Sequence, residues 1–245
     1  MIGTELLDDR RADPRAVRAE LRDIARLNAL FGGTRAVVEA LEPFFERAGN
    51  VQRATRHVPW TLLDVGTGSG DIALAAITAA RRYGIAVRPV GLDWNATAAR
   101  TAQGNGVPTM VADGNRMPLG PRSVDVVVAS QVLHHLPREV AARWIATFDG
   151  LARRVVVLAD LRRSRLAIAG VWAASLGLGM SPVTRHDAVL SLRRGYTREE
   201  FSAMLQEAGV AAVAWDRPGF RVVASWSPET SSVIRRPLPV TTDDG

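Results

Sequence analysis

The stretch Leu62-Leu63-Asp64-Val65-Gly66-Thr67-Gly68-Ser69-Gly70-Asp71 determines the fold class that we predict for this chain. An apolar run leads into three glycines at alternate positions, and a helical pattern follows them. Glycine accepts positive φ angles and lets a ligand approach the backbone closely. The first turn of a helix adds N–H groups that have no partner within the helix. The stretch therefore predicts a buried strand, a ligand-binding loop and a helix, in that order.

Short apolar runs alternate with helical patterns after this loop. The predicted strands are residues 61–65, 87–92, 107–111, 124–129 and 154–159. The predicted helices between them are residues 71–83, 95–104 and 138–151. Continuous apolar strands, each followed by a helix, are typical of a parallel sheet that is covered on both faces. We predict an α/β fold with a doubly wound, Rossmann-like sheet.

The two ends of the chain follow other patterns. Before the sheet, residues 12–30 and 36–47 have helical spacing, with Thr34 as a predicted cap and a predicted kink or break at Pro43. After it, we predict a helix over 164–180, a linker or short helix over 186–194, and a helix over 197–208 that begins with a capping box. Two strands over 210–215 and 221–226, joined by a turn at 217–219, complete the predicted elements.

Composition excludes several kinds of chemistry. The chain has 245 residues and no cysteine, and all 31 of its basic residues are arginine. Cysteine nucleophiles, thiolate zinc sites, Schiff-base lysines and Walker-type lysines are therefore absent. The formal charge of +6 lies mostly in the flanking segments and does not follow one face, so we expect no nucleic-acid partner. No apolar stretch reaches the roughly 20 residues of a membrane span, and we expect a cytoplasmic protein.

The spacing of the glycines indicates which kind of ligand the loop binds. A dinucleotide site has the pattern G-x-G-x-x-G, whereas the third glycine here comes one place early and Asp71 begins the helix. An aspartate at a helix N-terminus repels a pyrophosphate. Asp93, at the end of the next apolar run, can accept hydrogen bonds from ribose hydroxyls. We predict a nucleoside ligand without phosphates, which disfavours a nicotinamide oxidoreductase.

These residues resemble class I S-adenosylmethionine-dependent methyltransferases over about residues 60–159, and more weakly as far as 226. The resemblance is carried by residues 64–70, by Gly91-Leu92-Asp93-Trp94-Asn95, by Ala112-Asp113-Gly114-Asn115, and by 123–130 followed by Leu133-His134-His135-Leu136. It implies a seven-stranded sheet with an antiparallel last strand and S-adenosyl-L-methionine as cofactor. The cofactor-binding residues that we expect from it are Arg35, Asp64, Gly66, Thr67, Gly68, Asp93, Trp94, Asp113, Gly114 and Ser130.

The family pattern gives most of these residues a specific role. It implies that Gly66 and Gly68 approach the methionine portion, and that the Ser130 carbonyl accepts from the methionine ammonium. Asp93 would bind the ribose. Trp94 would lie against the adenine, and Asp113, with the Gly114 backbone beside it, would accept from the adenine amino group.

The front segment has a narrower resemblance. Residues 23–35 are similar to the N-terminal helix-turn of quinone-biosynthesis methyltransferases, where that segment folds over the cofactor as a lid. We therefore expect a helical lid over 1–58, a cofactor-binding domain over 59–227 with an acceptor-side insertion at 161–196, and a disordered tail over 228–245. The strings at 160–164 and 191–197 are similar to those of bacterial methyltransferases of aromatic polyketide pathways, which suggests secondary metabolism.

Two histidines are the predicted catalytic residues. His135 follows the fourth strand, at the edge where open α/β sheets bind ligands. His186 lies in the acceptor-side insertion, where Asp187 could orient it as a general base. The adjacent pair His134 and His135 lacks an obvious third ligand, so we expect no metal.

We predict methyl transfer to a small aromatic or apolar acceptor, at a hydroxyl oxygen. Carbon methylation of a quinone precursor is the first alternative, because the front segment is similar to that family. Nucleic-acid or protein methylation is a second alternative, although Ser130-Gln131-Val132-Leu133 replaces the Asn/Asp-Pro-Pro-aromatic string of base-amino methylation. A non-catalytic cofactor-binding protein is a third, since fold does not fix function.

Overall fold

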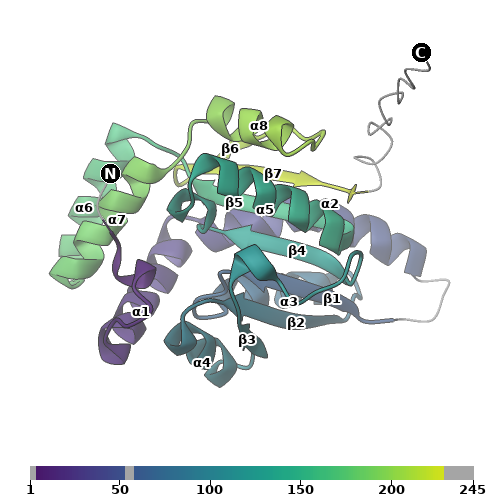
Figure 1. Cartoon of the computed structure of the whole chain (residues 1–245), viewed down its shortest axis with the longest axis horizontal. Coiled ribbons are helices and arrows are strands. Elements are labelled where there is room, and N and C mark those ends of the chain that lie inside the picture. Colours follow the sequence, from purple (N-terminus) through teal and green to yellow (C-terminus); the bar gives the residue numbers. More distant parts are fainter. Residues whose placement is uncertain (1–3, 53–57, 229–245) are drawn as a thin grey trace, which may run out of the picture.

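The computed structural model describes residues 4–52 and 58–228, which build one seven-stranded sheet with helices on both faces (Figure 1). The strand order is β3-β2-β1-β4-β5-β7-β6. The strands are β1 (Trp60–Val65), β2 (Val87–Asp93), β3 (Thr109–Val111), β4 (Val124–Ser130), β5 (Ala152–Leu161), β6 (Trp215–Arg217) and β7 (Arg221–Trp226). Strands β1 to β5 pair in parallel, and β7 is antiparallel to both β5 and β6. This arrangement confirms the predicted doubly wound sheet and its antiparallel last strand.

Eight α-helices accompany the sheet in the described part of the chain. They are α1 (Pro14–Leu30), α2 (Gly33–Gln52), α3 (Asp71–Arg82), α4 (Ala96–Gly104), α5 (Arg138–Leu151), α6 (Arg165–Gly177), α7 (Pro182–Arg194) and α8 (Arg198–Glu207). Helices α2 and α3 cover one face of the sheet, and α5 and α8 cover the other. No helix in residues 4–52 or 58–228 combines the length and the apolar character needed to cross a bilayer.

The side chains of β4 pack against the helices on both faces of the sheet. Val126 and Val128 are fully buried beneath α2 and α3, whereas Val127 and Ala129 are buried beneath α5 and α8. Successive side chains of a strand point to opposite faces, so a strand that is buried on both sides must be apolar throughout. The continuous apolar runs in the sequence have this cause.

The two N-terminal helices have different positions. The side chains of Val37, Leu41 and Phe45 from α2 are fully buried against the sheet. Helix α1 instead packs on α4, through Val17 and Leu21. Of these two helices, α1 therefore lies over the carboxyl ends of the strands, where a lid is expected.

Four local expectations differ from the structure. Helix α2 begins at Gly33 and contains Pro43, so Thr34 lies inside the helix and Pro43 does not end it. The region expected to be a linker or short helix is α7, which begins at Pro182 and is capped by the Ser181 hydroxyl. The strand predicted over 210–215 is wrong except for its last residue, because β6 spans Trp215–Arg217 and only these three residues pair with β7. The predicted tail lies outside the described residues after residue 228.

Candidate active site

The glycine loop connects β1 to α3 through three left-handed residues. The φ angles of Gly66, Gly68 and Gly70 are 71°, 55° and 80°. A Cβ atom on Gly66 would lie only 2.9 Å from a methyl carbon of Val132. The Thr67 hydroxyl donates to the Asp64 carboxylate over 2.8 Å and fixes the turn. The loop therefore needs glycine both for its backbone angles and for the space around it.

Two buried carboxylates support this loop from the strand ends. Burial raises the pKa of Asp64 to about 7, although the hydrogen bond from Thr67 opposes the shift. Asp93 accepts from the backbone N–H of Gly68 at 3.0 Å and from that of Asn95 at 2.9 Å. Burial raises the pKa of Asp93 too, and these backbone hydrogen bonds oppose it. Asp93 thus connects the glycine loop to the end of β2.

A cavity, here called the strand-end cavity, opens beside Asp93. It is lined by Leu7, Asp8, Leu21, Gly66, Gly68, Asp93, Trp94, Asn95, Ala98, Asp113, Gly114, Asn115, Gln131, Val132, His135, Leu136 and Trp144. A Cβ atom on Gly114 would collide with the ring of Trp144, so this position also requires glycine. Six of the residues predicted to bind the cofactor line this cavity: Gly66, Gly68, Asp93, Trp94, Asp113 and Gly114.

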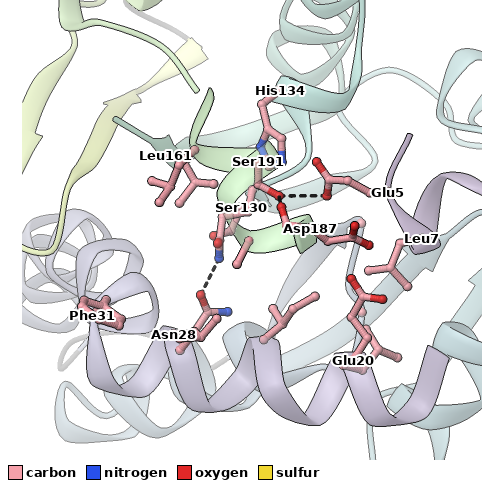
Figure 2. A pocket seen from close by; sticks show the side chains of 18 of the residues that line it. Glu5, Leu7, Glu20, Asn28, Phe31, Ser130, His134, Leu161, Asp187 and Ser191 are labelled. Carbon is pink, nitrogen blue, oxygen red and sulfur yellow. Dashed lines mark hydrogen bonds between the residues drawn. The ribbon is translucent and has the colours of Figure 1, made fainter. Parts of the chain in front are cut away.

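A second cavity adjoins the first, beneath α1, α6 and α7, and is here called the lid cavity (Figure 2). Its polar lining includes Glu5, Glu20, Asn28, Thr67, Ser130, His134, Asp187 and Arg221. Its apolar lining includes Leu27, Phe31, Leu161, Ala167, Val171 and Phe220. Leu7, Leu21, Gly66, Gly68, Gln131 and His135 line both cavities, so two ligands bound there would be neighbours.

His134 presents an imidazole to the lid cavity in a defined orientation. Its Nδ1 lies 2.7 Å from Oδ1 of Asp160, and both side chains are almost completely buried. Its Nε2 is buried and has no hydrogen-bond partner among the described residues. The other oxygen of Asp160 accepts from the backbone N–H groups of Leu133 and His134, and although burial opposes it, His134 holds the pKa of Asp160 below its ordinary value. Sequence analysis identified the neighbouring His135 and missed this residue.

His135 pairs with a segment near the start of the chain. Its Nδ1 lies 2.7 Å from Oδ1 of Asp8, in the short 3-10 helix Leu6–Asp8. Arg194 Nη1 contacts the same segment, at 3.0 Å from Glu5 Oε1 and 3.1 Å from Asp8 Oδ2. The Leu7 carbonyl accepts from the Trp94 indole over 3.2 Å. His135 therefore anchors this segment, and its imidazole is occupied by carboxylates.

Glu5 also supplies a third ligand atom beside the two histidines. Ligand atoms of Glu5, His134 and His135 lie within 4.8 Å of one another, an arrangement that could hold a metal ion. No sequence motif points to Glu5 at this place. Arg194 already donates to one oxygen of Glu5 and the Ser191 hydroxyl donates to the other. These contacts favour a carboxylate that is neutralised by the protein itself.

Glu20 of α1 and Asp187 of α7 place two carboxyl groups together in the lid cavity. Both residues are buried, with 3% and 4% of their surfaces exposed. Burial and the neighbouring Asp187 carboxylate raise the pKa of Glu20 to about 8. Oε2 of Glu20 is buried without a hydrogen-bond partner in the described part of the chain. The backbone N–H of Leu6 donates to Asp187 over 2.7 Å.

A buried arginine closes the lid cavity at its other end. Arg221, the first residue of β7, donates to Gln131 Oε1 over 2.9 Å and lies 3.4 Å from Asn28 Oδ1. Gln131 donates in turn to Asn28, whose amide reaches Asp71 at 3.4 Å. Desolvation lowers the pKa of Arg221 to about 10. This network joins α1, the end of β4 and the glycine loop, and sequence analysis did not identify it.

Several predicted residues lie away from both cavities. Arg35 is exposed and pairs with Glu39 on the outer side of α2, so the structure corrects the expectation that it binds the cofactor. His186 is exposed beside Trp172 in an outer groove between α6 and α7. It points away from its neighbour Asp187 because α7 turns successive residues to different sides. Asp64 also lines neither cavity. The other predicted residues Thr67, Ser130 and His135, by contrast, line the lid cavity.

The parallel sheet with an antiparallel last strand, the glycine loop after β1 and the acid at the end of β2 define the class I methyltransferase fold. Residues 62–155 match the family model described as a methyltransferase domain. A methyltransferase domain therefore matches the central part of the chain, which includes the glycine loop and Asp93. No curated protein matches the chain in sequence.

Solved structures share this fold at low sequence identity. The mitomycin 7-O-methyltransferase MmcR is 18% identical with a TM-score of 0.59, covering 92% of this chain and 61% of that one. A SAM-dependent methyltransferase from Aquifex aeolicus is 14% identical, with a TM-score of 0.52, and the match covers 88% of this chain and 98% of that one. The magnesium protoporphyrin IX methyltransferase of Synechocystis PCC 6803, with bound SAM, is 15% identical, with a TM-score of 0.50. That match covers 80% of this chain and 79% of the other.

Proposed function

We propose that this enzyme transfers the methyl group of S-adenosylmethionine to a hydroxyl oxygen of a small, largely apolar acceptor, with His134 as the general base. The observation that carries the proposal concerns His134, a residue that lines the lid cavity: its buried Nε2 has no hydrogen-bond partner among the described residues, while Asp160 holds Nδ1. His134 takes the role that the sequence suggested for His135 and His186. The two cavities provide one space for the cofactor and one for the acceptor.

The strand-end cavity fits the nucleoside part of the cofactor. Asp93 would bind the ribose, Trp94 would lie against the adenine, and Asp113 with Gly114 would contact the adenine edge. Gly66 and Gly68, which line both cavities, would approach the methionine part, with the Ser130 carbonyl nearby. The acidic lining suits a cationic sulfonium, whereas Asp71 at the start of α3 would repel a phosphate.

The lid cavity supports proton removal from a hydroxyl group. The Asp160 carboxylate accepts from Nδ1–H and so leaves Nε2 with a free lone pair. Nε2 would accept the hydroxyl proton, and the carboxylate would stabilise the imidazolium that forms. S-Adenosylmethionine supplies, when bound, a methyl group on a positively charged sulfur. The acceptor oxygen gains the methyl group, the sulfur retains the electron pair of the broken bond, and the proton passes from His134 to water.

The apolar wall of the lid cavity supports an acceptor with a hydrophobic body. Leu27 comes from α1, Phe31 directly follows that helix, Val171 comes from α6, and Phe220 comes from the turn before β7. An acceptor bound there is shielded from water, which strengthens the hydrogen bond between its hydroxyl group and His134.

A His134→Gln variant tests this function with a panel of phenols and naphthols. We expect its kcat to fall roughly 100-fold or more, because general-base catalysis contributes that much. Its affinity for S-adenosylhomocysteine, measured by calorimetry, should be unchanged. His186→Gln should leave kcat unchanged, because the structure places His186 on the outer surface. A His134→Gln enzyme with normal kcat, or a product methylated on carbon by mass and NMR analysis, would contradict the proposal.

A further inference from the structure

We infer that the lid cavity contains a subsite for a protonated amine, formed by Glu20 and Asp187, and that the methyl acceptor is an amine-bearing hydroxyl compound. The identity of the acceptor rests on the proposed function. The subsite itself rests on the charge and burial of the two carboxyl groups.

The countercharge of Glu20 and Asp187 is missing from the described part of the chain. Within residues 4–52 and 58–228, no arginine or histidine forms an ion pair with either of them. Burial and the neighbouring Asp187 carboxylate raise the pKa of Glu20 to about 8, and Oε2 of Glu20 has no hydrogen-bond partner in the described part of the chain. Two carboxyl groups without a counterion are therefore buried together in the lining of the cavity, where an unpaired charge is costly.

Several other carboxylates around the cavity are already neutralised. Glu5 and Asp8 share Arg194, and Asp8 also pairs with His135. Asp23 pairs with Arg26 at 3.2 Å and accepts from Thr184 at 3.3 Å. Asp71 also lines the cavity without an ion pair among the described residues, but it accepts from Ser69 and Asn28, whereas Glu20 keeps a buried oxygen without a hydrogen-bond partner.

The chemistry of an ammonium group matches the two atoms that are available. An ammonium has three N–H donors and no acceptor. It can donate to Oε2 of Glu20 and to the Asp187 carboxylate, and its positive charge compensates the charge of these groups. A neutral hydroxyl can donate one hydrogen bond but leaves the charge uncompensated.

The position of the pair separates this subsite from the catalytic base. Figure 2 shows Glu20 on α1 and His134 on opposite sides of the cavity. An acceptor that spans the cavity can therefore present its hydroxyl group to His134 and its amine to Glu20 and Asp187. This two-point attachment selects hydroxyaryl alkylamines over neutral phenols of the same size.

A matched pair of probes tests the subsite by calorimetry in the presence of S-adenosylhomocysteine. The probes are 4-(2-aminoethyl)phenol, which is cationic at neutral pH, and 4-propylphenol, its neutral counterpart. We expect the wild-type protein to bind the amine about tenfold more tightly or better. Glu20→Gln should reduce this ratio severalfold, because only the Asp187 carboxylate then remains, without weakening the binding of 4-propylphenol. Glu139→Gln, an exposed change on α5, should keep the wild-type ratio.

Further outcomes decide the assignment. Equal binding of both probes to the wild-type protein would overturn the subsite. A loss of S-adenosylhomocysteine affinity in Glu20→Gln as large as the loss for the amine would also overturn it, because the pair would then bind the cofactor. If Glu20→Gln does not fold, Asp187→Asn replaces it, since its amide oxygen can still accept from Leu6. Preferential binding of the amine without O-methylation would refute the proposed function and leave the subsite standing.

Discussion

Asp160 fixes both the position and the tautomer of His134. Its Oδ1 lies 2.7 Å from Nδ1 of the imidazole, while Oδ2 accepts from the backbone N–H of the same residue at 3.2 Å. Asp160 belongs to β5, and His134 follows β4, the neighbouring parallel strand. The sheet itself therefore holds the His134 imidazole in place, because the two strands end side by side.

Asp160→Asn should lower kcat by about 100-fold or more with little change in KM. An asparagine amide that donates to Nδ1 would favour the wrong tautomer and remove the lone pair from Nε2. Steady-state kinetics across pH measures the effect. The double variant with His134→Gln should be no worse than the more impaired single variant, because the two residues act as a unit.

Asp125→Asn is the matched control for that change. Asp125 is a buried carboxylate at the other end of the sheet, paired with Arg153 and Arg154. Its loss should reduce stability and leave the shape of the pH–rate profile unaltered. An Asp160→Asn enzyme with a wild-type profile would remove Asp160 from the mechanism.

Gly66→Ala should abolish tight binding of S-adenosylhomocysteine. The new Cβ would press against Val132 at 2.9 Å and displace the loop. Gly84→Ala separates this effect from backbone strain, because Gly84 has a similar φ of 73° and its surroundings leave open space within 4 Å of the position that a Cβ would take. We expect both variants to lose about 1 kcal/mol of stability from strain. Only Gly66→Ala should lose the ligand in calorimetry; equal affinities would show that the loop tolerates a side chain.

Glu20→Gln should stabilise the protein above neutral pH. The folded pKa of Glu20 is about 8 and the ordinary value is 4.5, so between these values the folded state binds more protons than the unfolded state. Stability therefore falls as pH rises through this window, and glutamine removes that fall. We expect the gain to reach on the order of 2 kcal/mol at pH 9 and to vanish below pH 4.5. Urea unfolding at pH 4.5, 7 and 9 measures it, and an equal effect at all three would contradict the raised pKa.

Chelation should leave the reaction unaffected. Arg194 and Ser191 already occupy the oxygens of Glu5, so the Glu5, His134 and His135 cluster has a protein cation in place of a metal ion. Activity should be the same after dialysis against EDTA and after addition of Mg²⁺, Mn²⁺ or Zn²⁺. A rate that is lost on dialysis and restored by one of these ions would make the cluster a metal site and would replace the role proposed for His134.

The parts of the site that sequence analysis predicted belong to single continuous motifs. The glycine loop, Asp93 and Gly114 each follow a strand, and parallel strands bring their carboxyl ends to one edge of the sheet. Strand pairing therefore places the residues at the ends of these strands next to one another, although they are distant in the sequence. The sequence singled out the pair His134 and His135, which lies in a 3-10 turn after β4. Adjacent side chains point in different directions, so only the folded turn shows that His134 is the one that contacts Asp160.

The rest of the site depends on contacts between distant segments. Asp187 is 181 positions from Leu6, and Arg194 is 189 positions from Glu5. No local pattern encodes such pairs, because they depend on how α7 and the first turn of the chain pack over the sheet. His186 shows the same difficulty, since it lies on the surface while the next residue of α7, Asp187, lines the cavity.

The short helix Leu6–Asp8 forms a wall that the two cavities share. Its backbone and side chains contact Trp94, His135, Asp187 and Arg194, and Leu7 lines both cavities. A change in the position of this short helix would therefore alter the lining of both cavities at once.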